Sequence, residues 1–580
     1  MMLTTLIPPR QRALVFQGGG ALGAYEAGAY KEILAKIQEE CSPHSQNSTT
    51  VTTNEFDIVI GTSIGAINAS VLVGHYLKNN NSWEGSADKL LEFWKGLSDP
   101  TIAEFFAKHN PFFDRFWTFW NTVNPNIANA DLARKFWSVF EFAFTPMGVS
   151  NLYTPIPHWG SKFLNPFSDL LPWWRYDFTR LRNYLTKFID FPIKTSFEEN
   201  QPRLMLVSVD VQDFSTPVIF DSYAKLHKPQ DPLDTKANSH DLHYDLQEGK
   251  ENLWFSEYGA ITNRHLVFYD GIGVDQVLAS ALGKYSLNHP TLEDKNTGTI
   301  REFWDGGYHS NTPLRQLVME HRKYWNERLK KLELKEKSEI KNAPDLEVYI
   351  VNLHASIMKF IPTDKDLIDE RESDMIFHDR TKHDEQMVYL VTDYVNLCKK
   401  FINLAKTKGF VQDAEALLEE MAPSSTRFGG LTRYKDIVNG LVMLSKVWRI
   451  DRMGEKVDNS TIFGKTTDFT QSSIKDLINK GMVDAKFSLL KHELVFGIED
   501  MVHEQSLSWE NGLKLAKYIA EIVSLVQNYK PANEIIKKIH ELISLVNKFD
   551  DDELTPSNKK ILTKYIEEIL ELIRINSPSR

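Results

Sequence analysis

The chain has 580 residues and carries 67 basic and 78 acidic side chains, which gives a formal net charge of −11. Hydrophobic residues make up 42% of the chain and charged residues 25%, a composition that excludes disordered and fibrous proteins. The acidic balance argues against binding nucleic acid through bulk electrostatics, so no nucleic-acid partner is expected. Two cysteines, Cys41 and Cys398, cannot form a disulfide framework, and nothing requires an oxidising compartment.

Neither a targeting segment nor a membrane span is predicted. Pro8 and Pro9 interrupt the apolar residues of the N-terminus, which are too few for the core of a signal peptide. No uninterrupted apolar run approaches the roughly 18 residues that a membrane span needs. These features favour a cytoplasmic protein, and they leave peripheral contact with a membrane surface open.

The expected elements of the first half of the chain are alternating strands and helices. Apolar runs bounded by glycine predict buried strands, and apolar residues spaced by three and four predict helices. Nearly continuous apolar strands that alternate with helices indicate an α/β fold with a mostly parallel sheet covered on both faces. Strands are expected at residues 13–16, 56–60, 204–211, 265–269, 300–304 and 346–353, and helices at 22–37 and 66–76.

Residues 101–178 are unusually rich in aromatic side chains. They hold 21 aromatics in 78 positions, including six of the 13 tryptophans of the chain. One interpretation is a helical insertion with a small aromatic core of its own. The other is an apolar cap over a site for an apolar substrate, since aromatic side chains also favour membrane–water interfaces.

The second half of the chain is predicted to be helical. Residues 1–320 hold 20 of the 29 glycines and residues 321–580 only 9, and glycine is costly inside helices. Beyond residue 355 every predicted element is a helix. Apolar stripes at helical spacing run through residues 515–526, 535–546 and 561–573, and the simplest interpretation is a small helical bundle.

A glycine-rich turn is expected between the first strand and the first helix. Residues 18–23 (GGGALG) fit the pattern G-x-G-x-x-G of dinucleotide-binding folds. That interpretation needs an acidic residue at the end of the second strand, whereas Glu39 and Glu40 end a helix. We therefore expect an anion site without a dinucleotide, because a helix N-terminus presents unpaired backbone N–H groups.

A second turn from strand to helix carries a candidate nucleophile. Residues 61–65 (GTSIG) fit G-x-S-x-G, in which a sharp turn holds the serine hydroxyl outward. Glycines flank such a serine because side chains there would collide with neighbouring backbone. Ser63 is therefore a candidate nucleophile, and the alternative is an ordinary serine at a helix N-cap.

A nucleophilic serine needs a base. The candidate histidines are His265, His309 and His354, and none of them lies in a recognisable motif. Asp305 is a different candidate, because it follows an apolar strand and precedes two glycines that would let it approach another loop closely. Taken alone, an Asp-Gly-Gly sequence usually marks only a turn.

Together, the three motifs resemble those of the patatin-like phospholipase family in order and in approximate spacing. The resemblance covers roughly residues 11–355 and implies a three-layer α/β/α acyl hydrolase domain, with 101–178 as an insertion or cap. Residues 356–580 would then form a helical C-terminal domain. The motifs are residues 18–23, then 61–65 with Ala66, Ile67 and Asn68, then Asp305, Gly306 and Gly307 with Asn311 and Pro313.

The resemblance also implies the chemistry of the site. Ser63 and Asp305 would form a dyad without histidine that hydrolyses acyl esters of lipids, with no metal and no cofactor. Many members of the family have arginine where this chain has Leu22, so no preference for an anionic head group is implied. The implied oxyanion hole consists of Gly18, Gly19, Gly20 and Gly23, and Gly61 and Gly65 flank the nucleophile.

Two alternatives stay open at this level. A lipid-binding or scaffolding protein on a degenerate hydrolase fold would be favoured by the loss of Ser63 or Asp305, and both are present. Acyl transfer to an acceptor other than water shares the acyl-enzyme with hydrolysis. Histidine–aspartate pairs at 240–243 and 378–384 match no known ligand spacing, so no metal is expected. The expected partner is a lipid or phospholipid substrate, and the oligomeric state is not predicted.

Overall fold

The structure of the 580-residue chain is a computed structural model. The strand expected at 265–269, the three helices expected beyond residue 510 and most of the aromatic segment 101–178 lie outside the residues that it describes. The described residues are 7–41, 54–98, 151–152, 154–157, 174–215, 217–223, 271–283, 286, 289–293, 299–336, 343–358, 361, 365–420, 433–439, 444–452, 466, 469 and 471–504.

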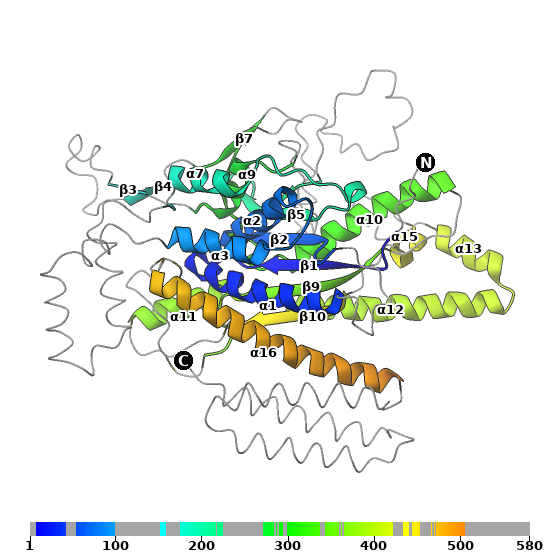
Figure 1. Cartoon of the computed structure of the whole chain (residues 1–580). Coiled ribbons are helices and arrows are strands. Elements are labelled where there is room, and N and C mark those ends of the chain that lie inside the picture. Colours follow the sequence, from blue (N-terminus) through cyan, green and yellow to red (C-terminus); the bar gives the residue numbers. More distant parts are fainter. Residues whose placement is uncertain are drawn as a thin grey trace, which may run out of the picture.

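An eight-stranded mixed sheet lies at the centre of the fold (Figure 1). Its strand order is β10-β9-β1-β2-β5-β8-β7, and β6 pairs with β5. The neighbours from β10 to β5 are parallel, whereas β6, β7 and β8 pair antiparallel. The strands are β1 (Arg10–Phe16), β2 (Ile58–Thr62), β5 (Arg203–Asp210), β6 (Val218–Asp221), β7 (Thr291–Glu293), β8 (Ile300–Asp305), β9 (Asp345–Asn352) and β10 (Leu444–Asp451).

Alternate side chains of the strands face two helical layers. In β1, Leu14 and Phe16 join a core that includes α1, α2 and α3, whereas Ala13 and Val15 join a core that includes α10. Successive residues of a strand point to opposite faces, so an apolar run is buried on both. This is the expected three-layer α/β/α arrangement. The helices are α1 (Gly23–Cys41), α2 (Ile64–Lys78), α3 (Ser86–Leu97), α7 (Thr179–Phe188), α9 (Val274–Ala281), α10 (Leu314–Glu336), α11 (Lys365–Phe377), α12 (Lys382–Thr407), α13 (Val411–Glu419), α15 (Tyr434–Asn439) and α16 (Gln471–Glu504), with single 3₁₀ turns η1 (Gly20–Leu22), η2 (Phe197–Glu199) and η4 (Gly306–Tyr308).

The expected strands that fall on described residues are present, with shifted ends. The strand expected at 56–60 begins at Ile58 and ends at Thr62, and the one expected at 346–353 begins at Asp345 and ends at Asn352. The helices expected at 22–37 and 66–76 correspond to α1 and α2. No helix in the described part of the chain is both long and apolar enough to cross a bilayer.

The expectation of helices alone beyond residue 355 is wrong. Strand β10 pairs in parallel with β9 and forms one edge of the central sheet. Lys446 and Arg449 interrupt the apolar pattern of β10, and for this reason the sequence does not predict a strand there. Arg449 is nevertheless buried, because it pairs with Asp379 and Glu385. The division of the chain at residue 355 stays a prediction.

Helix α16 packs along α1 at a close approach of two glycines (Figure 1). A Cβ at Gly28 would lie 2.0 Å from the carbonyl oxygen of Ile478, and a Cβ at Gly481 would lie 2.0 Å from that of Tyr25. Backbones this close leave no room for any side chain. The last described helix therefore covers the helix that begins at the glycine-rich turn.

Two described stretches of the aromatic segment are extended strands. Residues Thr154–Pro157 (β3) and Trp174–Asp177 (β4) pair as a two-stranded antiparallel sheet. These two stretches are therefore strands, whereas one of the two interpretations of the segment was a helical insertion. The interpretation of residues 101–178 as an apolar cap stays a prediction.

Candidate active site

Strand β5 brings the two candidate residues together at one end of the sheet. Val207 of β5 pairs with Thr62 of β2, and the next residue, Ser208, pairs with Asp305 of β8. Ser63 directly follows Thr62, and Asp305 is the last residue of β8, so both lie beside the same end of β5. Their side chains meet there, because the Ser63 Oγ donates a hydrogen bond of 2.5 Å to Oδ2 of Asp305.

Ser63 lies on a strained turn. Its φ of 57° and ψ of −125° lie outside the regions that residues with a Cβ prefer. It precedes α2, yet its side chain makes no cap hydrogen bond, which excludes the ordinary N-cap interpretation. The glycines are required as expected, since a Cβ at Gly61 would lie 2.2 Å from the carbonyl oxygen of Gly65. Strain of this kind costs about 1–3 kcal/mol and is concentrated at functional sites.

Asp305 lies in an environment that favours its neutral form. Burial raises the pKa of Asp305 from 3.8 to about 6, against the opposing effect of hydrogen bonds from Ser63 and Gly307. The Gly307 N–H donates to Oδ1 at 2.7 Å, which leaves Oδ2 for the Ser63 hydroxyl. A carboxyl group with this pKa is still mostly ionised at pH 7, and it is a stronger base than an ordinary aspartate.

The glycine-rich turn contacts Ser63. A Cβ at Gly18 would lie 2.9 Å from the Cβ of Ser63 and 2.4 Å from Oδ1 of Asn311, so only glycine fits there. The backbone N–H groups of Gly19 and Gly20 donate to no acceptor among the described residues. Unpaired N–H groups on a turn beside a serine hydroxyl form a candidate site for a negatively charged oxygen.

The peptide between Gly18 and Gly19 is fixed through its carbonyl group. This oxygen accepts a hydrogen bond of 3.1 Å from Nδ2 of Asn311 and lies 3.1 Å from Nε2 of His354. Because a carbonyl oxygen can only accept, Nε2 of His354 must carry the proton. The C=O and N–H of a trans peptide point in opposite directions, so these two donors also set the direction of the Gly19 N–H.

The following peptides are fixed in the same way. The N–H of Leu22 donates to the carbonyl oxygen of Gly19 at 3.1 Å, and this sets the direction of the Gly20 N–H. The N–H of Ala21 donates to the carbonyl oxygen of Thr466 at 2.8 Å. A residue that lies just before α16 therefore helps to hold the first turn of the chain.

Asn68, which follows the serine motif, connects this motif to the first helix. Its Nδ2 donates to Oε2 of Glu26 at 2.8 Å and to the carbonyl oxygen of Gly23 at 3.0 Å. Its Oδ1 accepts from Nε1 of Trp94 at 2.9 Å. Burial raises the pKa of Glu26 well above its ordinary value, against the opposing effect of the hydrogen bond from Asn68. Asn68 thus holds α1 and α2 in a fixed relation.

The structure does not place a histidine at Ser63. His354 lies between Gly18 and Asp374, with its Nδ1 at 3.2 Å from Oδ1 of Asp374. His309 is exposed, and His265 lies outside the described residues. In the part of the chain that the structure describes, the Ser63 hydroxyl bonds to Asp305 alone. Sequence reasoning missed the contact of His354 with the turn, because 336 residues separate it from Gly18 and no motif marks it.

Metal-binding clusters are absent from the described residues. They contain no group of three or more His, Cys, Asp and Glu side chains that could hold an ion. The pair at 240–243 lies outside them, and Asp379 of the second pair forms an ion pair with Arg449.

Comparison with known proteins identifies the family. The model of the patatin-like phospholipase family matches residues 14–318, which is more than half of the chain and includes all three motifs. No curated protein matches the chain. The crystal structure of VipD from Legionella pneumophila is similar with 12% identity and a TM-score of 0.26, over 98% of this chain and 80% of that one, a likeness too weak to support an inference. On the family match, the chain belongs to the patatin-like phospholipase family.

Proposed function

We propose that this protein hydrolyses carboxylic ester bonds of lipids, with Ser63 as the nucleophile and Asp305 as the base. The observation that carries the proposal is the hydrogen bond of 2.5 Å from Ser63 Oγ to Asp305 Oδ2, made by a serine with a positive φ. Membership of the family supports lipid acyl hydrolysis in general. The roles of the two residues are inferred from their geometry.

In the first half-reaction, Asp305 accepts the proton of Ser63 while Oγ attacks the carbonyl carbon of the ester. The carbonyl oxygen becomes an oxyanion, and the N–H groups of Gly19 and Gly20 are the donors proposed to stabilise it. One such donor typically contributes about 3–4 kcal/mol to the transition state. When the intermediate collapses, the alcohol leaves with the proton from Asp305, and the acyl group stays on Ser63.

In the second half-reaction, water replaces the alcohol. Asp305 accepts a proton from the water molecule, whose oxygen attacks the acyl carbon, and the same two N–H groups stabilise the second oxyanion. Collapse of this intermediate releases the fatty acid, and the proton on Asp305 returns to Ser63 Oγ. The dyad is thereby restored for the next turnover.

Covalent labelling with a fluorophosphonate tests the nucleophile. The full chain should form an adduct at Ser63, and Ser63→Ala should form none. Ser70→Ala is a matched control, because Ser70 is a buried serine of α2 whose hydroxyl donates to the carbonyl oxygen of Ala66 at 2.7 Å. Failure of the folded chain to react would refute the proposal and favour a protein that only binds lipid.

Analysis of the products tests the reaction. Phospholipids, acylglycerols and soluble esters should be offered separately, each with and without an added alcohol. Release of free fatty acid would support hydrolysis. Formation of a new ester in place of the free acid would instead identify an acyltransferase. If no carboxylic ester is turned over, the proposed function is wrong.

A further inference from the structure

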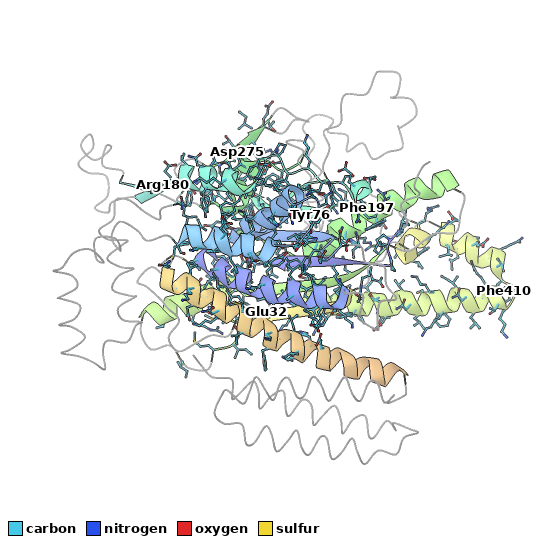
Figure 2. All side chains as sticks on the ribbon, viewed as in Figure 1. Glu32, Tyr76, Arg180, Phe197, Asp275 and Phe410 are labelled. Atoms are coloured by element: carbon cyan, nitrogen blue, oxygen red, sulfur yellow. The ribbon has the colours of Figure 1, made fainter. Side chains whose placement is uncertain are left out.

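Helix α12 carries an exposed apolar stripe with the spacing of a coiled-coil helix. It extends beyond the sheet in Figure 1, and Phe410, labelled in Figure 2, lies just past its far end. Six of the eight exposed apolar side chains of α12 recur at alternating steps of three and four residues, as at the a and d positions of a heptad repeat, and the other two are the less exposed Tyr389 and Val391. We call these six residues, which are 43% to 62% exposed, the seam: Met387, Leu390, Tyr394, Leu397, Phe401 and Leu404.

The face of α12 that packs against the rest of the molecule is not the seam. Thr392 and Val395 are buried, and Val388 packs against the core between the sheet and α10. These residues occupy positions b and f of the same heptads, on the opposite side from the seam. Single exposed apolar residues are common on protein surfaces. A continuous apolar stripe in heptad register, roughly 25 Å long at 1.5 Å per residue, is unusual on a helix face that stays exposed in the described part of the chain.

We propose that the seam is the contact surface of a homodimer, in which α12 of two copies pairs antiparallel. An antiparallel pair places each a position beside a d position of the other helix. We place the two-fold axis of the dimer midway between Tyr394 and Leu397. Each of the six seam residues then faces an apolar seam residue of the other copy, and one axis relates all the pairs, as an isologous dimer requires. The facing pairs are Met387 with Leu404, Leu390 with Phe401, and Tyr394 with Leu397.

The charged residues beside the seam favour a second copy of the chain as the partner, and they favour the antiparallel orientation. Asp393 and Lys400 both occupy position g, are exposed, and have no ion-pair partner among the described residues. In an antiparallel pair, position g of one helix faces position g of the other. Asp393 of each copy therefore lies beside Lys400 of the other copy, and the dimer contains this pair of opposite charges twice. In a parallel pair, g faces e, where this helix has the uncharged Val391, Cys398 and Ala405. Only the antiparallel pair matches opposite charges.

A lipid surface suits the seam less well. Helices that lie in a bilayer interface carry Lys and Arg along their polar side, whereas Asp393 and Lys400 border this seam with opposite signs. The net charge of −11 also opposes binding to anionic lipid. Residues 505–580, which carry apolar stripes in their sequence, are the other candidate occupant, and the mass of the protein in solution distinguishes them from a second copy.

A charge-swap cycle measured by sedimentation equilibrium tests the proposal on the full chain. The protein should be a dimer, and either Asp393→Lys or Lys400→Asp should raise its dissociation constant by roughly tenfold or more, because each change opposes like charges twice. The double variant should restore the original value. Leu397→Glu should also disrupt the dimer, whereas Leu417→Glu, which alters a residue of α13 that is 55% exposed and outside the seam, should not.

A cysteine cross-link tests the register. Positions e also face each other in the antiparallel pair, so Val391→Cys lies beside the partner's Cys398. In a Cys41→Ser background, an added thiol oxidant should accept two electrons and two protons per bridge and give a disulfide-linked dimer. Within one helix these positions are roughly 10 Å apart, beyond the limit of about 7 Å for a bridge. The same variant with Cys398→Ser should stay uncross-linked.

Each other outcome overturns the proposal. A dimer that the double charge swap does not restore is not paired antiparallel through α12. A full chain that is monomeric at every concentration has no such dimer. If that monomer floats with vesicles that contain phosphatidylserine, and Leu397→Glu abolishes flotation, the seam contacts lipid. If it does not float, residues 505–580 are the occupant that remains.

Discussion

Replacing Asp305 by Asn should make the folded protein more stable at neutral pH while it removes the proposed base. Burial raises the pKa of Asp305 from 3.8 to about 6 in the folded protein, and the unfolded chain keeps the ordinary value. Between about pH 4 and pH 6 the folded state therefore binds more protons than the unfolded state. The free energy of unfolding falls as the pH rises through this window, and the loss is complete above about pH 6.

The magnitude follows from the size of the shift. A rise of about two pKa units corresponds to about 3 kcal/mol of lost stability above pH 6, at 1.36 kcal/mol for each unit. This value is an upper bound for two reasons. Asp305 is not fully shielded from solvent, and the asparagine amide has to take the place of the two carboxylate oxygens that accept hydrogen bonds from Ser63 and Gly307. A net hydrogen bond contributes about 0.5–1.5 kcal/mol, so we expect a gain of about 1–2 kcal/mol at pH 8.

Urea unfolding at pH 4, 6 and 8 measures this effect. The difference between Asp305→Asn and the unaltered protein should be small at pH 4, where both groups are neutral, and should grow toward pH 8. Ser63→Ala is the control, because it removes the same hydrogen bond and keeps the carboxyl group. Ester hydrolysis by Asp305→Asn should fall by about a thousandfold or more. An equal loss of stability at pH 4 and pH 8 would refute the reasoning.

Three further outcomes are expected. For the unaltered protein, kcat/KM should rise with pH through about 6, because Asp305 must be ionised to act as a base; a flat profile between pH 5 and pH 7 would contradict this role. His354→Ala should lower kcat on a soluble ester by about tenfold with little change in KM, and His354→Gln, which keeps an N–H donor, should recover part of it, since the direction of the Gly19 N–H depends on this contact. Gly481→Val should separate α16 from α1 and lower the free energy of unfolding by about 1–3 kcal/mol, measured in urea; an unchanged midpoint would show that the close approach is dispensable.

The parts of the site that the sequence predicts are those specified by neighbouring residues. Ser63 is marked by the strand before it, the helix after it and two glycines, and all of these lie within a few residues. Asp305 is marked by its strand and the glycines that follow. The sheet was predictable for the same reason, because residues 13–16 of β1 (ALVF) are buried on both faces of the sheet and are all apolar. Local constraints leave a local pattern.

The parts that could not be predicted depend on residues distant in the chain. His354 and Thr466 contact the glycine-rich turn through a ring nitrogen and a backbone carbonyl group, and neither contact requires a recognisable sequence around it. Strand β10 was hidden for another reason. Arg449 is a charged residue in a buried position, and only the partners Asp379 and Glu385, which lie on other elements, make that position favourable.

The contacts that fix the glycine-rich turn extend beyond the part of the chain that defines the family. The family match ends at residue 318, whereas His354, its partner Asp374 and Thr466 all follow it. The two N–H groups of the turn can stabilise an oxyanion only while their peptides keep one direction, since a donor that must reorient during the reaction loses much of its effect. In this chain, the later residues supply part of that rigidity, and α16 packs against α1 behind the same turn. The described C-terminal elements therefore belong to the support of the candidate site, in addition to any role of their own.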